Sequence, residues 1–236
     1  MLTIEKFVLP SPEQWEIIME GMRNPKNSWG KMDSYTTKIE DPETLETADY
    51  EWFMGENDHD LAMRLTNGGS VHAKYRRMIP VWVTINAPLY WWKEFDTYKV
   101  GTVANSCSTM HKIHAKEFVQ DDFSTEYLED VWLNDFYCLE WSLNRAREKF
   151  LETGEKLKRT DLTDAERRHT VAQQKLYWWQ MIQLLPSSYN QKRTVFLSYE
   201  VLANMYKWRR NHKLDEWHTL CDWIETLPYS ELIIGG

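Results

Sequence analysis

Residues 124–185 constrain the fold most, because they carry two successive apolar stripes at helical spacing. The first stripe covers about 124–151 and the second about 163–185, where Thr163 and Glu166 form a capping box. The stripes consist of Leu128, Trp132, Phe136, Leu139 and Leu143, and then of Val171, Leu176, Trp179, Ile182 and Leu185. The charged stretch 154–161 separates them. Two long helices joined by a short turn pack against each other, so we expect an antiparallel helical hairpin.

The rest of the chain mixes helix and strand signals. Residues 78–86 are rich in β-branched and aromatic side chains and predict a buried strand, after which Pro88 opens a short helix. Further helices are expected at 13–22, which follows a capping box of Ser11 and Gln14, and at about 58–65, 194–211 and 214–224. We expect irregular structure with short helical pieces at 23–50 and a loop of small residues at 97–110. The predicted fold class is α+β, a small twisted sheet surrounded by helices, in one domain spanning 1–236.

The charge balance argues against a nucleic-acid partner. The 236 residues carry a formal net charge of −8 and the pI is about 5.4, so a phosphate backbone would meet a like-signed protein. The three cysteines, Cys107, Cys138 and Cys221, form no C-x-x-C motif, which indicates a reducing compartment and a cytoplasmic protein. No signal peptide opens the chain, and its most apolar segment, 78–92, is too short and too polar to cross a bilayer, so we expect no membrane partner.

Two polar clusters carry candidate chemistry. His111 and His114 would share a helix face, but no obvious carboxylate partner accompanies them, so we predict no metal site. The dense basic run 207–213 is either a solvated helix face or a phosphate anchor, since arginine forms forked bonds to phosphate. The sequence has no G-x-G-x-x-G, P-loop or G-x-S-x-G motif, which excludes the Rossmann and P-loop nucleotide sites.

Two segments carry a family resemblance. The first is Ala87-Pro88 with the helix that follows it and the loop 97–110, aligned with a signature R-H-R-x-x-S-x-N-x-x-S-x-R-Y. The second begins with Leu-Leu-Pro at 184–186, aligned with L-P and then N-x-R-x-L-x-x-F-x-x-x-R, in which Leu202 and Arg209 keep their places. Together these segments resemble the flavin-dependent thymidylate synthase family, over most of the chain except the polar stretch 23–57 and part of the helical pair.

The resemblance implies a homotetramer with sites shared between subunits, flavin adenine dinucleotide (FAD) as cofactor and deoxyuridine monophosphate (dUMP) as substrate. Catalytic residues stay unknown. Carried over position by position, the nucleotide-binding residues are Arg209, Lys99, Cys107 and Glu94, and the cofactor-binding residues are Asn204, Ser198 and His72.

Most charged positions of the family motifs are replaced here. The R-H-R triplet becomes Thr97-Tyr98-Lys99, the arginine before Leu202 becomes Glu200, and another arginine becomes Ile182. A charge-assisted bond to phosphate contributes about 1.5–3 kcal/mol, so losing several lowers the affinity for FAD and dUMP by orders of magnitude, and Glu200 adds a like charge. We therefore predict a divergent, nucleotide-binding protein that is not competent for the standard methylation of dUMP. Such a protein would fit a bacteriophage or a mobile element.

Two other functions stay open: an active flavin-dependent thymidylate synthase with rebuilt contacts, and a structural or interaction protein without activity. Cys107 stands where the family has serine, and is either a thiol beside a bound base, activated by Lys99, or a small buried cysteine without a role. Arg209 either reaches a ligand phosphate or pairs with a carboxylate of the following helix, Asp215 or Glu216.

Overall fold

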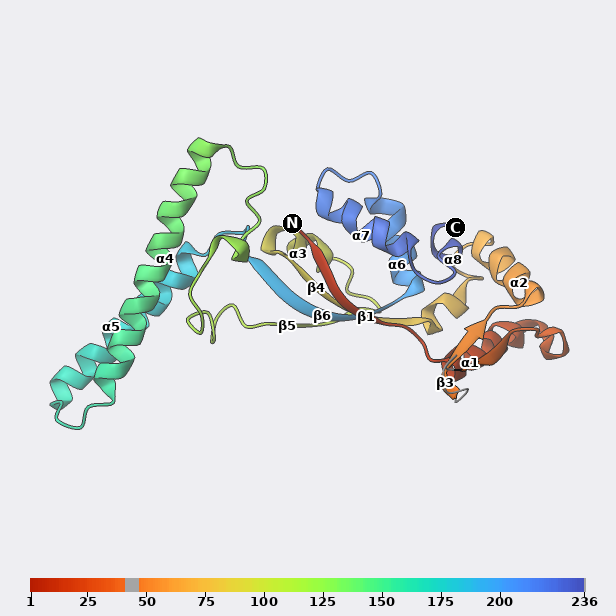
Figure 1. The fold of residues 1–236 in the computed structure, drawn as a ribbon, viewed down its shortest axis with the longest axis horizontal. Helices are drawn as coiled ribbons and strands as arrows, with labels where there is room; N and C mark the ends of the chain where they lie inside the picture. The colour runs from red at the N-terminus through yellow and green to blue at the C-terminus, as the bar shows by residue number, and fades with distance from the viewer. Residues whose placement is uncertain (41–46, 236) are drawn as a thin grey trace. The chain divides into compact units, whose positions relative to one another are not determined.

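The computed structural model describes residues 1–40 and 47–235, and its elements divide into two compact units (Figure 1). Unit 1 comprises Met1, Asn86–Glu94 and Ser106–Arg193, and unit 2 comprises Leu2–Ile85, Phe95–Asn105 and Thr194–Gly236. The α+β fold class is confirmed by the mixture of helices with small sheets. None of the described helices is both long enough and apolar enough to cross a membrane.

Unit 1 is built on the helical hairpin. Its helices are α4 (Asp130–Leu157) and α5 (Asp164–Leu184), which lie side by side in Figure 1. The capping box at Thr163 and Glu166 is present, as predicted. The first helix begins later than residue 124 and continues through Gly154, where we predicted the turn. A Cβ at Gly154 would lie 3.0 Å from the Gln174 side chain, so glycine permits the close approach of the two helices.

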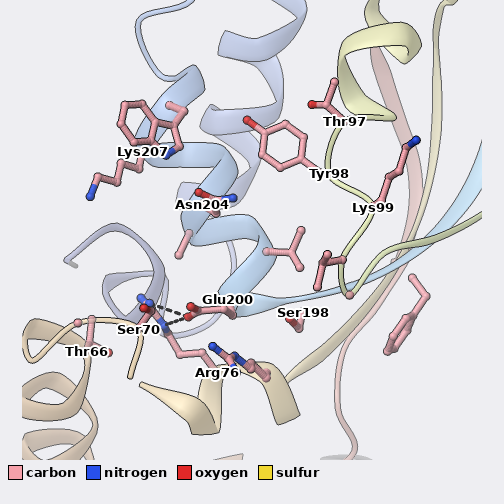
Figure 2. A pocket seen from close by; sticks show the side chains of 18 residues that line it. Thr66, Ser70, Arg76, Thr97, Tyr98, Lys99, Ser198, Glu200, Asn204 and Lys207 are labelled. Atoms are coloured by element: carbon pink, nitrogen blue, oxygen red, sulfur yellow. Dashed lines mark hydrogen bonds and ion pairs between the residues drawn. The ribbon is translucent and has the colours of Figure 1, made fainter. Parts of the chain in front are cut away.

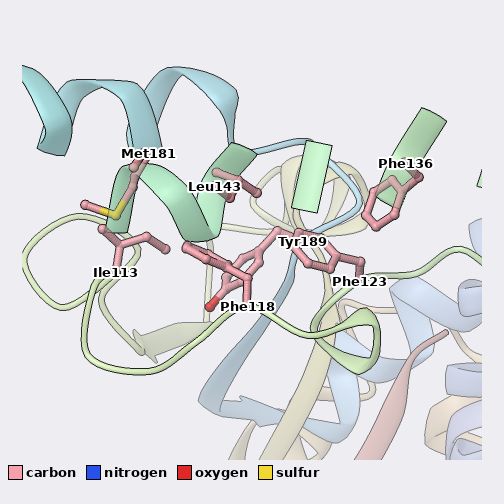
Figure 3. Close-up of a cluster of buried hydrophobic side chains, with 8 residues drawn as sticks. Ile113, Phe118, Phe123, Phe136, Leu143, Met181 and Tyr189 are labelled. Carbon is pink, nitrogen blue, oxygen red and sulfur yellow. The ribbon is translucent and has the colours of Figure 1, made fainter. Parts of the chain in front are cut away.

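Aromatic side chains fill the core of unit 1. Figure 3 shows this cluster beside α4 and α5; its buried members are Ile113, Phe118, Phe123, Phe136, Leu143, Ala146, Met181 and Tyr189. The ring of Phe123 lies edge-on to those of Phe136 and Tyr189, with centroids 4.9 Å and 5.6 Å away. Edge-to-face packing of this kind is favourable, so the abundant aromatic residues serve the core here.

Most of the four-stranded sheet, with strand order β1-β4-β6-β5, belongs to unit 2. The strands are β1 (Thr3–Val8), β4 (Pro80–Pro88), β5 (Val103–Ser106) and β6 (Asn190–Ser198). In β4 the side chains of Val81, Val83 and Ile85 are buried while Trp82 between them is exposed, which is the period-two pattern of a sheet with one covered face. The predicted strand is therefore confirmed, and α3 (Leu89–Phe95) follows Pro88 as expected.

The remaining helices of unit 2 precede β4 or follow β6 along the chain. They are α1 (Pro12–Arg23), α2 (Glu56–Asn67), α6 (Tyr199–Arg209), α7 (Asp215–Glu225) and α8 (Glu231–Ile234), with short 3-10 turns at Asn24–Lys26, Trp29–Lys31 and Lys74–Met78, and one in unit 1 at Gln120–Asp122. The capping box of Ser11 and Gln14 begins α1, and the ring of Trp15 stacks on that of Trp52 with centroids 4.8 Å apart.

Three expectations from the sequence are wrong. Residues 194–198 belong to β6 and not to the following helix. Val195 and Leu197 are buried and Phe196 between them is less buried, which is the alternation of a strand, and the Thr194 hydroxyl bonds to that of Thr84 on β4. The stretch 23–50 is not irregular throughout. It contains β2 (Tyr35–Glu40), which pairs antiparallel with β3 (Thr47–Phe53), and part of the stretch, 41–46, lies outside the described residues. The loop 97–110 contains β5.

Candidate functional site

Unit 2 contains a pocket of about 990 Å³, shown in Figure 2. Four segments form it: the end of α2 with residues 69–77, the loop 97–101, the end of β6, and one face of α6. Its lining residues are Thr66, Gly69, Ser70, Arg76, Arg77, Thr97, Tyr98, Lys99, Val100, Gly101, Phe196, Ser198, Glu200, Val201, Ala203, Asn204, Lys207 and Trp208. The size suits a small-molecule ligand.

The pocket is basic although the chain as a whole is acidic. Its lining contains four cationic side chains, Arg76, Arg77, Lys99 and Lys207, and one carboxylate, that of Glu200. Arg77, Lys99 and Lys207 are exposed, and none has a carboxylate partner within 4.0 Å in the part of the chain that the structure describes. Unpaired cations around a concave surface attract an anion, so the site is suited to a phosphate or carboxylate ligand.

The fourth cation, Arg76, is already neutralised. Its Nε donates to Glu200 Oε2 at 2.9 Å, its second terminal nitrogen lies 2.7 Å from the same oxygen, and Nη1 donates to the Leu232 carbonyl at 3.1 Å. From the sequence we expected Glu200 to add a like charge against a phosphate, and the structure pairs that charge with the buried guanidinium of Arg76. Three positive side chains are left for a ligand.

Arg209 lies next to the pocket without lining it. Its Nε donates to the Tyr98 hydroxyl at 2.9 Å, and its guanidinium carbon lies 4.7 Å from the ring centroid of Trp217. Tyr98 itself lines the pocket. Arg209 therefore contacts the site through the tyrosine, and the basic run 207–213 divides into different roles: Lys207 lines the pocket, whereas Arg210 pairs with Asp222 at 2.6 Å.

The structure brings together some of the residues that the sequence predicts. Lys99, Ser198 and Asn204 line the pocket, but His72 is exposed and does not line it. Glu94 and Cys107 belong to unit 1. Cys107 is exposed, so the alternative of a buried cysteine is wrong; its backbone nitrogen donates to the Lys192 carbonyl at 2.9 Å.

Sequence reasoning missed Arg76 and Arg77. Their signal was weak: two adjacent arginines just before a predicted strand, outside both aligned motifs. The histidine pair lies in unit 1, in a turn and not on a helix. The pKa of His114 is lowered by burial and by the nearby cations Lys112 and Arg147. Across residues 1–40 and 47–235, no three His, Cys, Asp or Glu side chains gather as metal ligands would.

Comparison with known proteins gives the fold. No family model and no curated protein matches the chain. Solved structures do match: thymidylate synthase X (ThyX) from Helicobacter pylori with FAD and dUMP aligns at 16% identity with a TM-score of 0.56, over 100% of this chain and 98% of that one. A second structure of the Helicobacter pylori flavin-dependent enzyme, also with FAD and dUMP, aligns at 14% identity with a TM-score of 0.53, over 99% and 98%. The chain has the fold of these flavin-dependent thymidylate synthases, as the two sequence segments predict.

Proposed function

We propose that the chain is a divergent protein of the flavin-dependent thymidylate synthase fold that binds a nucleotide in the unit 2 pocket and does not perform the standard flavin-dependent methylation of dUMP. The single observation that carries this proposal is the set of exposed cations, Arg77, Lys99 and Lys207, around a pocket of about 990 Å³ in an acidic chain. A phosphate monoester is the nucleotide group that such cations bind.

The rest of the lining supports a nucleotide over a bare anion. Tyr98, Phe196 and Trp208 contribute aromatic surface on which a planar base can pack, and Asn204 adds an amide that both donates and accepts hydrogen bonds. Phosphate, sugar and base thus each have a suitable surface within one unit. This is the usual composition of a small-molecule site, with mainly apolar walls and a few polar groups that fix orientation.

The same lining suits FAD less well. The resemblance assigns Asn204, Ser198 and His72 to the flavin, and the first two line the pocket whereas His72 does not. A diphosphate also needs cations where the family has arginines, and one cation of the lining, Arg76, is already paired with Glu200. The residues of this pocket therefore supply only part of what a flavin diphosphate would need.

Active thymidylate synthesis is the second candidate. It is favoured by the alignment of the whole chain with ThyX structures that contain FAD and dUMP. Such an enzyme would need residues from other subunits to complete the flavin site. This candidate function therefore requires the homotetramer that the resemblance implies. Light scattering tests the assembly, since a tetramer has four times the chain mass of 28.4 kDa.

A thermal-shift series with visible absorbance separates the three functions. Dialysed protein is measured alone and with dUMP, uridine monophosphate (UMP), FAD, and dUMP plus FAD. We expect colourless protein that is stabilised by a nucleotide. A yellow protein that forms thymidylate when reduced flavin and a one-carbon donor are supplied would overturn the proposal in favour of the enzyme. No stabilisation by any ligand would favour a structural or interaction protein.

A further inference from the structure

One face of α6 presents three different polar groups to the pocket in a fixed order. Glu200, Asn204 and Lys207 are four and three residues apart, a spacing that places side chains on the same helix face. At 1.5 Å per residue the first and last are about 10 Å apart along the helix axis. Figure 2 shows the order along the helix: carboxylate, amide, ammonium. A ligand lying along this face meets a negative group at one end and a positive group at the other.

The Glu200 carboxylate uses one of its two oxygens. Both contacts from Arg76 end on Oε2, at 2.9 Å and 2.7 Å. Within the described residues Oε1 has no hydrogen-bond partner, and Glu200 lines the pocket with 19% of its side chain exposed. An ionised carboxylate has about four lone-pair sites, so Oε1 has full capacity to accept hydrogen bonds from a ligand.

The carboxylate is also held in place. Arg76 is 6% exposed and is itself fixed by the bond from Nη1 to the Leu232 carbonyl. Glu200 lies in the first turn of α6, where the helix dipole favours a negative charge. A hydrogen-bond acceptor that is already oriented loses little entropy when a ligand binds, which makes it effective for discrimination.

We propose that Glu200 Oε1 accepts a hydrogen bond from a neutral donor on the nucleoside part of the ligand, while Lys207, near the other end of this helix face, binds the phosphate and Lys99 adds positive charge to the pocket. The inference rests on the proposed nucleotide-binding function and names its ligand class: a nucleoside monophosphate with an O–H or N–H group directed at Glu200. The donor is the 2′-hydroxyl of a ribose or a base N–H, because both are neutral and both satisfy a carboxylate. A phosphate placed against Oε1 would bring two hydrogen-bond acceptors together with no donor between them, so the order of groups along α6 sets the orientation of the ligand.

Titration calorimetry with matched ligands tests the donor. UMP and dUMP differ in the 2′-hydroxyl, and dUMP and 3-methyl-dUMP differ in the base N–H. We expect at least one pair to differ about tenfold in Kd on the wild-type chain, because a charge-assisted hydrogen bond is lost. In Glu200→Gln the amide satisfies Arg76 with its oxygen and turns a donor toward the pocket, so the difference should vanish for the base N–H pair and shrink to that of a neutral hydrogen bond for the 2′-hydroxyl pair. Glu148→Gln, on the exposed surface of α4, is the matched control and should retain the difference.

Equal affinity within both ligand pairs on the wild-type chain overturns this inference and leaves nucleotide binding standing. A difference that keeps its full size in Glu200→Gln assigns the contact to another residue and also overturns it. Failure of every nucleotide to bind overturns the proposed function and this inference together. If Glu200→Gln does not fold, the double variant Arg76→Met with Glu200→Gln removes both charges of the pair at once, which proteins tolerate better than an unpaired buried charge.

Discussion

Unit 2 contains two buried arginines paired with carboxylates among its described residues, Arg23 with Asp58 and Arg76 with Glu200. Both oxygens of Asp58 are used: Oδ1 accepts from Arg23 Nε at 2.5 Å, and Oδ2 accepts from the backbone of Asp33 and from both the backbone and the hydroxyl of Ser34, at 2.6–3.1 Å. Asp58 is completely buried. In the other pair both contacts from Arg76 end on one carboxylate oxygen, and Glu200 lines the pocket.

The difference between the pairs shows how the same chemistry serves two purposes. A buried carboxylate without partners costs several kcal/mol of stability, so Asp58 needs hydrogen bonds to both of its oxygens. Those bonds connect α2 to α1 and to residues 33–34. Glu200 escapes most of that cost because it borders a pocket open to water. Its free oxygen is therefore tolerated in the unliganded chain and is available to a ligand. The closed pair contributes to stability, and the open pair contributes to recognition.

The largest expected effect is on the closed pair. Asp58→Ala leaves Arg23 charged and buried, and should lower the free energy of unfolding by about 3–5 kcal/mol. Glu200→Ala should lower it less, since water reaches the site. Urea unfolding followed by circular dichroism measures both. Asp60→Ala, two residues further along α2 and exposed, is the control and should change stability little. A larger loss in Glu200→Ala than in Asp58→Ala would reverse the assignment of the two pairs.

The contribution of the closed pair to stability should depend on pH. Burial works to raise the pKa of Asp58, but hydrogen bonds from Ser34, Arg23 and Asp33 outweigh it, so the pKa is lowered. The unfolded chain then binds more protons, and the stabilisation is fully present above the ordinary value of about 3.9 and is lost as pH falls through the folded pKa. The stability difference between the wild-type chain and Asp58→Asn should therefore be constant from about pH 7 to 5 and shrink below about pH 4. Urea unfolding over this range measures it, and an unchanged difference at pH 3 would contradict the mechanism.

A feature of the fold or of the candidate site can be predicted from the sequence where its signal is local. Capping boxes at Ser11 and Thr163 and the β-branched and aromatic composition of residues 78–86 predict their elements, because these signals act within a few residues. The sequence predicts the start of α6 too early, at about residue 194. Residues 195–197 are apolar and fit a strand or a helix equally well, and only pairing with β4 decides for the strand. The Arg76–Glu200 pair joins residues 124 positions apart, a distance over which no spacing rule applies. Lys99, Ser198 and Asn204 were found because they fall on motif positions of the family.

Removing a cation should affect binding and not stability, the reverse of the Asp58 substitution. Lys99→Ala and Lys207→Ala each delete a positive charge that has no carboxylate partner among the described residues, so we expect about tenfold weaker nucleotide binding for each. The free energy of unfolding should change by less than about 0.5 kcal/mol, as for ordinary surface substitutions. Calorimetry and urea unfolding measure the two quantities. Lys175→Ala on the exposed surface of α5 is the control, and the proposal fails if both pocket variants bind as tightly as it does.

The smallest effect is expected at Arg209, where a substitution should change both stability and nucleotide binding slightly. It is half-buried, bonded to Tyr98 and packed on Trp217, so Arg209→Lys loses the planar contact and should cost about 1 kcal/mol of stability. Nucleotide affinity should fall by less than for Lys99→Ala, because the loosened group is Tyr98 and not a phosphate contact. Arg210→Lys, whose carboxylate partners lie at the surface, is the control and should be nearly neutral. If Arg209→Lys instead weakens binding as much as Lys99→Ala while the free chain keeps its melting temperature, Arg209 contacts the ligand directly, and the motif alignment describes it better than its bond to Tyr98.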